Sequence, residues 1–180
     1  WYTNQLGNHY YYGQKGEGYS GLHEVDGKTY YFSWGEVCTN QCVSENGKSY
    51  YCDPEGYVSD ISGDGWHQVG DYYFYIKNGQ YLSNTVEKIG NSYYGFDYRG
   101  VMYANRDFSI WNFESQMSSY YRAKEDGRLY ANEWYTDERE VFYYYGEDGK
   151  AYSGLHEIDG IQYCFSEYCR RYQDQSVTID

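Results

Sequence analysis

The sequence has too little leucine, isoleucine, valine and phenylalanine to fill an ordinary globular core, and its mean hydropathy is −0.94. No hydrophobic stretch approaches the length that crosses a bilayer, so we expect no membrane insertion. No long segment shows the 3.6-residue period of an amphipathic helix, so a helical fold is not expected. Only one proline is present against 21 glycines, which suits a chain with frequent tight turns.

Basic residues are also scarce. Lysine and arginine total 14 against 27 acidic residues, which gives a formal net charge of −13 and a pI near 4.6. Nucleic acids and anionic membranes bind clusters of Lys and Arg, so neither is an expected partner. An acidic surface attracts cationic ligands, but it also keeps a tyrosine-rich protein in solution, and we favour the second interpretation.

Catalytic and metal-binding patterns are missing. His23-Glu24 and His156-Glu157 lack the second histidine of a HExxH motif. No two carboxylates stand out as the acid and base of a glycosidase, and no Cys-x-x-Cys pair indicates zinc. We therefore expect no enzyme activity, metal or cofactor.

The sequence does contain a long internal repeat. Shifted by 133 positions, Trp1–Phe32 aligns with Trp134–Phe165 without a gap, with 18 identities in 32 positions. A shorter repeat of roughly twenty residues lies within it, as in Gly21–Asn40 and Gln41–Asp60. Each short unit has an apolar or Trp position, a polar arm, a Gly turn, a Tyr pair and a second Gly turn. Such periodicity predicts a repeat architecture.

The turn residues indicate the structure of one unit. The dipeptides that suit a type I′ turn, in which both central residues have positive φ, are Asp26-Gly27, Asn46-Gly47, Asp148-Gly149 and Asp159-Gly160. Aromatic residues typical of strands follow the turns. Each unit is therefore predicted to be a β-hairpin, and because one hairpin is not stable alone, the units must stack. The predicted fold is an all-β solenoid of stacked β-hairpins.

Composition and repeat boundaries define the predicted domain. With 29 Tyr and 23% aromatic residues, tyrosine rings can replace the missing aliphatic core while their hydroxyls stay in water. We expect one repeat domain over residues 1–180, with about eight hairpin units and an irregular unit near 106–132. The chain starts at a repeat boundary without a signal peptide, so we expect a segment of a larger surface or secreted protein.

The units resemble the cell-wall-binding repeats of bacterial surface proteins. This family includes choline-binding modules, glucan-binding repeats and the receptor-binding repeats of clostridial toxins. The resemblance rests on Gly21-Leu22, Gly65-Trp66 and Gly154-Leu155, on aromatic triplets such as Tyr30-Tyr31-Phe32, and on later pairs such as Gly56-Tyr57. It implies a hairpin solenoid, an extracellular location and a non-catalytic attachment role.

The resemblance leaves two ligand classes open. Choline needs a cage of aromatic faces, and the choline-binding pattern resembles Trp134 with Phe142, closed by a ring from the next unit. Trp1 has His9 at the matching place and Trp66 has Asp71. The units with leucine look more like the toxin repeats, which bind carbohydrate.

Our leading hypothesis is a module that binds a cell-wall polysaccharide or host glycan by aromatic stacking. The alternatives are a choline-binding module and a structural spacer that binds no small ligand. For each tyrosine, a purely structural role in the stack is the competing interpretation. The predicted ligand-binding residues are Trp1, Tyr11, Trp66, Tyr73, Trp134, Phe142 and Tyr144.

Five cysteines suggest disulfides, which suit an extracellular protein. In the repeat alignment Cys42 and Cys52 replace Leu22 and Phe32, which favours a Cys42–Cys52 bond. A second pair, Cys164 and Cys169, could face each other across a two-residue turn. Cys38 is then left over, or it pairs with Cys42 instead. Both alternatives stay open, because connectivity does not follow from sequence.

Overall fold

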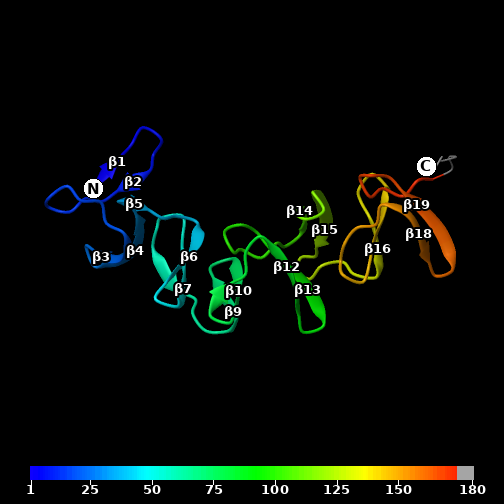
Figure 1. The fold of residues 1–180 in the computed structure, drawn as a ribbon, viewed down its shortest axis with the longest axis horizontal. Helices are drawn as coiled ribbons and strands as arrows, with labels where there is room; N and C mark the ends of the chain where they lie inside the picture. The colour runs from blue at the N-terminus through cyan, green and yellow to red at the C-terminus, as the bar shows by residue number, and fades with distance from the viewer. Residues whose placement is uncertain (174–180) are drawn as a thin grey trace. The chain divides into compact units, whose positions relative to one another are not determined.

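The computed structural model of the protein describes residues 1–173 and contains 19 β-strands (Figure 1). Within this range there is no helix, so no helix there could cross a membrane. The strands pair into eight hairpins, each made of two consecutive strands, and no sheet closes into a barrel in the described residues. The predicted all-β fold of stacked hairpins is confirmed.

The contacts of the chain gather into two compact units, where the sequence predicted one repeat domain. The first unit contains residues 1–84 and 96–102. The second contains residues 85–95 and the described residues from Tyr103 onward. The end of the predicted domain, residues 174–180, lies outside the described residues.

Three sheets make up the first unit. Five strands form the order β1-β2-β5-β4-β3, followed by β6-β7-β8 and β11-β10-β9. Their bounds are β1 Tyr2–Thr3, β2 His9–Tyr10, β3 Gly21–Val25, β4 Lys28–Ser33, β5 Glu36–Val37, β6 Gln41–Glu45, β7 Lys48–Cys52, β8 Val58–Asp60, β9 Gly65–Val69, β10 Tyr72–Lys77 and β11 Gln80–Tyr81.

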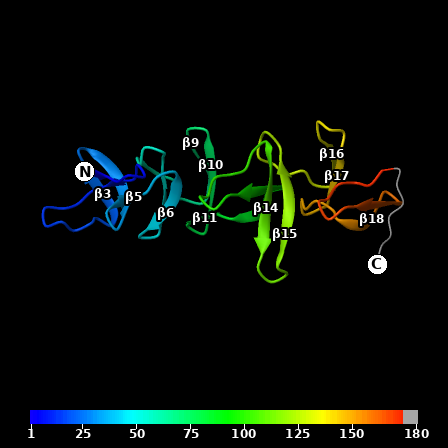
Figure 2. The same cartoon turned by 90° about the horizontal axis from the view of Figure 1, so that it is seen from above.

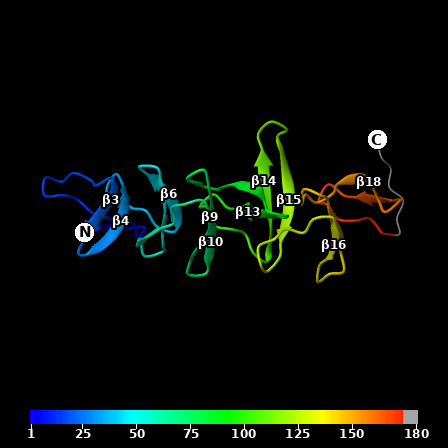
Figure 3. The same cartoon turned by 90° about the horizontal axis from the view of Figure 1, so that it is seen from below.

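Four two-stranded hairpins follow along the chain, and the first of them ends at the boundary between the units. Their bounds are β12 Thr85–Ile89, β13 Ser92–Phe96, β14 Arg106–Asn112, β15 Met117–Ala123, β16 Glu133–Thr136, β17 Phe142–Tyr145, β18 Gly154–Ile158 and β19 Ile161–Phe165. The hairpin β14–β15 has the longest strands, and it is the irregular unit of the sequence. Figures 2 and 3 show its two strands side by side from opposite directions.

Backbone hydrogen bonds tie each hairpin of the second unit to the one before it. A residue in the segment that follows one hairpin donates its N–H to a strand of the hairpin before that one. These bonds are Leu129 to Tyr93 (2.8 Å), Ala151 to Tyr120 (2.9 Å) and Arg171 to Phe142 (2.8 Å). The segment after a hairpin thus satisfies polar groups of its neighbour, which a lone hairpin would leave to water.

The predicted type I′ turns are confirmed at three of the four places. Both central residues have positive φ in Asp26-Gly27, Asn46-Gly47 and Asp159-Gly160. The prediction is wrong for Asp148-Gly149, where only Gly149 has positive φ. Gly149 donates its N–H to Gly146 (3.0 Å), and the Asp148 carboxylate accepts the Lys150 N–H (3.1 Å), so this turn follows a strand instead of joining a hairpin.

The core of the first unit is small and partly aromatic. Phe74 and Ile76 are fully buried and pack with Tyr51, Ile61, Cys42 and Val101. The rings of Phe74 and Tyr51 are 4.7 Å apart, and the Tyr51 hydroxyl donates to Asn40 (3.2 Å). Tyrosine therefore fills core volume while its hydroxyl keeps a polar partner, as the composition predicts.

The second unit has a core of stacked rings. Phe108 lies between Tyr103 (centroids 4.0 Å apart) and Tyr121 (5.3 Å), and both pairs are inclined by 16°. The Phe108 ring also covers Gly95, where a Cβ would collide with it. Leu129 packs against the same cluster. A side chain at position 95 is thus excluded by the ring stack.

Neither predicted disulfide is present, because all five cysteines are free thiols. Cys42 is paired across the hairpin with Tyr51, and Cys52 with Gln41, so their side chains leave from opposite faces. Cys169 lies within a wider turn, where its N–H donates to Ser166 (2.9 Å), while Cys164 is paired with Leu155. The strand register separates Cys42 from Cys52, whereas Cys169 is separated from Cys164 because it lies in a turn beyond the end of β19.

Alkylation should therefore distinguish the cysteines. Burial raises the pKa of Cys38, Cys42 and Cys169, and raises the pKa of Cys52 to about 12, whereas Cys164 is only half-buried. Because the thiolate is the nucleophile, we expect iodoacetamide at pH 8 to label Cys164 first. Peptide mass spectrometry would measure this, and all five should react in denaturant. A cross-linked Cys42–Cys52 peptide in a non-reduced digest would contradict it.

Candidate functional site

Three tryptophans begin hairpins and repeat one local arrangement. In each case the indole meets a tyrosine of its own hairpin edge to face, at 67–75°, and in the first hairpin both residues flank the strands β1 and β2. The three pairs, each with ring centroids 5.1 Å apart, are Trp1–Tyr11, Trp66–Tyr75 and Trp134–Tyr144. Edge-to-face packing of this kind is the favoured geometry of aromatic pairs.

A ring of the next hairpin also lies beside each tryptophan, and beside Trp66 this ring is Phe96, with centroids 6.0 Å apart. Tyr30 lies 5.2 Å from Trp1 at 69°, and Tyr163 lies 5.0 Å from Trp134 at 71°. The long repeat in the sequence is therefore also a repeat of ring geometry. Tyr163 is the ring that the sequence expected from the next unit without naming it.

The structure places Tyr73 away from Trp66. The strand register sets Tyr75 opposite Trp66 and Tyr73 opposite Gln68. The partner tyrosine comes nine positions after Trp66, but ten positions after Trp1 and Trp134. The strand register, and not the Tyr72-Tyr73 pair, therefore decides which ring meets Trp66, and the predicted ligand-binding residue Tyr73 is not that ring.

Phe142 joins Trp134 around a charged group of the same chain. The guanidinium carbon of Arg171 is 4.3 Å from the Phe142 ring centroid, 5.6 Å from that of Trp134 and 5.9 Å from that of Tyr163. In the first copy, His9 stands where Phe142 does, and its Nδ1 is 3.0 Å from the Thr3 hydroxyl. Trp134 and Phe142 thus both lie within 6 Å of one cation, Arg171, which the sequence analysis did not foresee.

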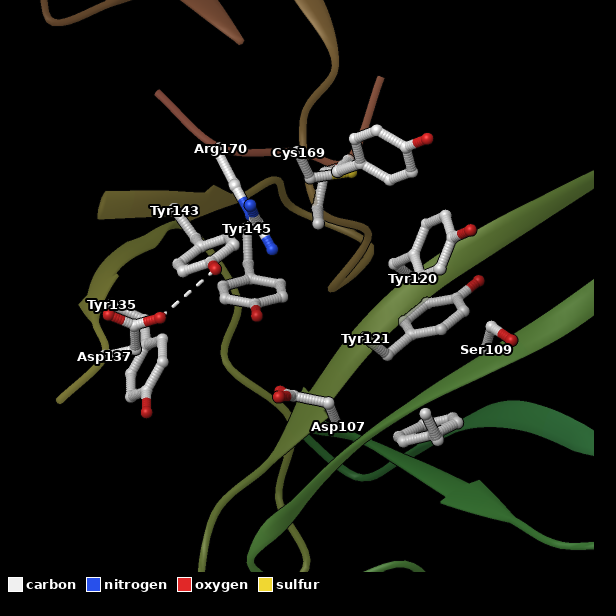
Figure 4. A pocket seen from close by; sticks show the side chains of 13 residues that line it. Asp107, Ser109, Tyr120, Tyr121, Tyr135, Asp137, Tyr143, Tyr145, Cys169 and Arg170 are labelled. Carbon is white, nitrogen blue, oxygen red and sulfur yellow. Dashed lines mark hydrogen bonds between the residues drawn. The ribbon is translucent and has the colours of Figure 1, made fainter. Parts of the chain in front are cut away.

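A separate pocket of about 340 Å³ lies in the second unit (Figure 4). Residues of β14–β15, of β16–β17 and of the segment after β19 line it. Its lining residues are Asp107, Phe108, Ser109, Tyr120, Tyr121, Tyr135, Asp137, Tyr143, Tyr145, Ala151, Tyr168, Cys169 and Arg170. Its size is within the range of small-molecule sites, and its walls combine aromatic rings with a few polar groups.

Tyrosines of two hairpins line opposite sides of the pocket. In Figure 4, Tyr120 and Tyr121 face in from one side, while Tyr143 and Tyr145 face in from the other. The Tyr143 hydroxyl donates to Asp137 (3.3 Å). Ring faces and hydrogen-bonding oxygens are thus presented to the same space.

Charge states in the pocket follow from its hydrogen bonds. The backbone N–H groups of Val141 and Arg139, together with the Tyr143 hydroxyl, hold the pKa of Asp137 below its usual value. Burial raises the pKa of Tyr143 and Tyr145, so their hydroxyls stay protonated at neutral pH. The pocket therefore offers an ionised acceptor beside neutral donors.

Asp107 and Arg122 form a second polar element beside the tyrosines. Arg122 Nη1 lies 2.7 Å from Asp107 Oδ1, and the Arg122 guanidinium lies 4.0 Å from the Tyr135 ring centroid. The ion pair holds the Asp107 carboxylate in place at the pocket wall. It leaves that carboxylate as an acceptor, because each carboxylate has several lone-pair sites.

The histidines have local structural partners. His23 and His156 each bond through Nε2 to a carbonyl three residues earlier (2.9 Å), and His67 to a carbonyl four residues earlier (2.7 Å). His156 also stacks on Tyr152 at 3.8 Å. They occupy one repeat position and make similar local hydrogen bonds, as inheritance within a repeat predicts. In the described residues, no three His, Cys, Asp or Glu side chains are grouped to hold a metal ion.

Sequence reasoning missed the tyrosine pocket and Arg171. The pocket draws on the irregular unit near 106–132, and that irregularity was the available signal. Arg171 lies beyond Phe165, where the aligned segment ends, so the repeat comparison did not reach it.

No family model matches the chain, and no curated protein sequence matches it. Solved structures do resemble it. CbpJ from Streptococcus pneumoniae has a TM-score of 0.54 at 19% identity, covering 98% of this chain and 59% of that one. Choline binding protein F from Streptococcus pneumoniae has a TM-score of 0.53 at 18% identity, covering 93% and 56%.

A second structure of choline binding protein F, determined in the presence of a tetrasaccharide-pentapeptide peptidoglycan analogue, has a TM-score of 0.52 at 18% identity. It covers 93% of this chain and 57% of that one. The chain thus spans less than two thirds of the length of each of these proteins. At such identities the likeness concerns the fold, which rests on hairpin pairing and not on shared ligand residues. The chain therefore has the stacked-hairpin fold of the choline-binding repeat proteins.

Proposed function

We propose that the protein is a non-catalytic, extracellular module that binds a cell-wall or host glycan in the tyrosine pocket of the second unit. The observation that carries the proposal is the pocket itself, where six tyrosines and Phe108 surround two carboxylates. Sugars have apolar C–H faces that stack on rings and hydroxyls that exchange hydrogen bonds with polar groups. Both kinds of partner line the same 340 Å³.

The chemistry of the carboxylates supports binding without hydrolysis. A glycosidase needs a protonated carboxylic acid, whose pKa is raised, beside a second carboxylate. Asp137 has a lowered pKa, and Asp107 is ion-paired with Arg122. Both are thus suited to accept hydrogen bonds from sugar hydroxyls.

A second function, choline binding, is supported by the tryptophan clusters. Trp1 with Tyr11 and Tyr30 presents ring faces of the kind that hold a quaternary ammonium, and Trp1 is 55% exposed. The negative net charge favours a cationic ligand. The similar structure determined with a peptidoglycan analogue supports including cell-wall fragments among the ligands to be tested.

The glycan proposal is tested by calorimetry with a panel of muropeptide, glucan and host-type oligosaccharides. The variant is Tyr168→Ala, because Tyr168 lines the pocket yet is 65% exposed and contributes little to the core. Loss of one stacking ring should weaken binding about tenfold. The matched control is Tyr98→Ala, a 78% exposed tyrosine of the first unit, which should leave the affinity unchanged.

Three outcomes separate the hypotheses. Saturable sugar binding that only Tyr168→Ala weakens supports the pocket. Binding of choline alone supports the tryptophan clusters. Absence of binding to the whole panel would favour a structural spacer.

A further inference from the structure

The Arg171 guanidinium lies among three aromatic rings. Phe142 is the nearest at 4.3 Å, and Trp134 and Tyr163 lie at 5.6 and 5.9 Å. Trp134 and Tyr163 meet at 71°, so their faces line different sides of the space that the guanidinium occupies. All three distances are within the range in which ring quadrupoles attract a cation.

Arg171 occupies a repeat position that has an uncharged residue in the other hairpins compared. After most hairpins, one residue of the following segment pairs with one of the last two residues of the second strand. At the equivalent positions these residues are Val37, Val58, Met102, Leu129 and Ala151, which pair with Phe32, Cys52, Phe96, Ala123 and Tyr145. Arg171 pairs in the same way with Phe165. After β9–β10 the equivalent residue is Tyr81, which pairs with Ile76. Since an uncharged residue satisfies the position in all of these cases, hairpin packing does not require the charge.

The first copy of the long repeat has the counterparts of Trp134 and Tyr163, with His9 in place of Phe142. Trp1 contacts Tyr11 and Tyr30 at 5.1 and 5.2 Å, as Trp134 contacts Tyr144 and Tyr163 at 5.1 and 5.0 Å. Val37 takes the place of Arg171 there and is buried in the cluster of Val25 and Phe32, against which Tyr11, Tyr19 and Tyr30 pack. The two copies therefore differ in whether a charged side chain fills the aromatic space.

We propose that Arg171 is an internal ligand of the Trp134–Phe142–Tyr163 cage and excludes external quaternary ammonium ions from it. The backbone of Arg171 is fixed by its bond to Phe142 (2.8 Å), so its head group is present at a high effective concentration. A free cation must displace it to reach the rings. This cage is separate from the tyrosine pocket, and the inference does not depend on the glycan proposal.

The test removes the internal cation and supplies an external one. Choline is titrated into the ¹⁵N-labelled full chain, and the indole N–H resonance of Trp134, assigned with Trp134→Phe, is followed by NMR. In Arg171→Ala this resonance should shift saturably with a Kd of about 1 mM. In the unchanged protein the same shift should require at least about tenfold more choline.

Two further variants complete the test. Arg171→Lys keeps a cation and should bind as weakly as the unchanged protein, whereas Arg171→Gln removes the charge with a smaller loss of packing and serves if the alanine variant unfolds. Retained dispersion of the other indole resonances reports folding. The proposal is overturned if Trp134 responds equally with and without Arg171, or if it stays silent in a folded variant that lacks the charge.

Discussion

Phe74→Ala should lower the free energy of unfolding of the first unit by about 3–5 kcal/mol, the usual cost of emptying a buried phenylalanine site. Phe74 is fully buried, its ring is 4.7 Å from that of Tyr51, and it packs in the same cluster as Ile61 and Ile76. The cluster is small, so the remaining side chains cannot close the cavity without leaving their own contacts.

The measurement is equilibrium denaturation followed by hydrogen exchange, which locates the loss to particular strands. Protection should fall first in β7 and β10, which carry Tyr51 and Phe74. The matched control is Tyr98→Ala, with an exposed ring of the same unit, and its stability should change by no more than about 0.5 kcal/mol. Equal effects of the two substitutions would show that the Phe74 cluster is not the core.

Phe108→Ala should destabilise the second unit by about 2–4 kcal/mol, because Phe108 is the middle ring of a stack. Its removal separates Tyr103 from Tyr121 and leaves a void above Gly95. Phe108 also lines the tyrosine pocket, so sugar binding should be lost together with stability.

The control for Phe108→Ala is Phe113→Ala, because Phe113 belongs to the same hairpin and lies in the connection between β14 and β15. Phe113 is 81% exposed, so its removal should alter neither the unfolding midpoint nor binding. Thermal unfolding and calorimetry on both variants provide the comparison. If Phe108→Ala keeps full stability, the ring stack does not hold the second unit together.

The fold was predictable from the sequence because local signals agreed with one another. Asp26-Gly27 and Asn46-Gly47 specify tight hairpin turns, and the tyrosine-rich runs that follow specify strands. The long repeat aligns Trp1 with Trp134, and the structure gives the two indoles similar tyrosine neighbours. The two ring distances are 5.1 and 5.2 Å around Trp1, and 5.1 and 5.0 Å around Trp134.

The disulfides and the pocket were not predictable from the same signals. Cys42 and Cys52 were aligned with Leu22 and Phe32, yet those two residues face Tyr31 and Gly21 and are not partners. A strand alternates its faces at every residue, so an offset of one position reverses the expected contact. The pocket unites three segments that no single repeat contains.

The backbone hydrogen bonds that link the segment after one hairpin to the hairpin before it determine which insertions and deletions the chain tolerates. Leu129, Ala151 and Arg171 each carry a bond of this kind, so three hairpins of the second unit are attached in the same way. Insertion or deletion of one whole unit would restore that attachment, whereas a cut inside a unit would leave an open strand edge and an uncovered ring cluster. Length variants of this protein should therefore differ by complete hairpins of roughly twenty residues.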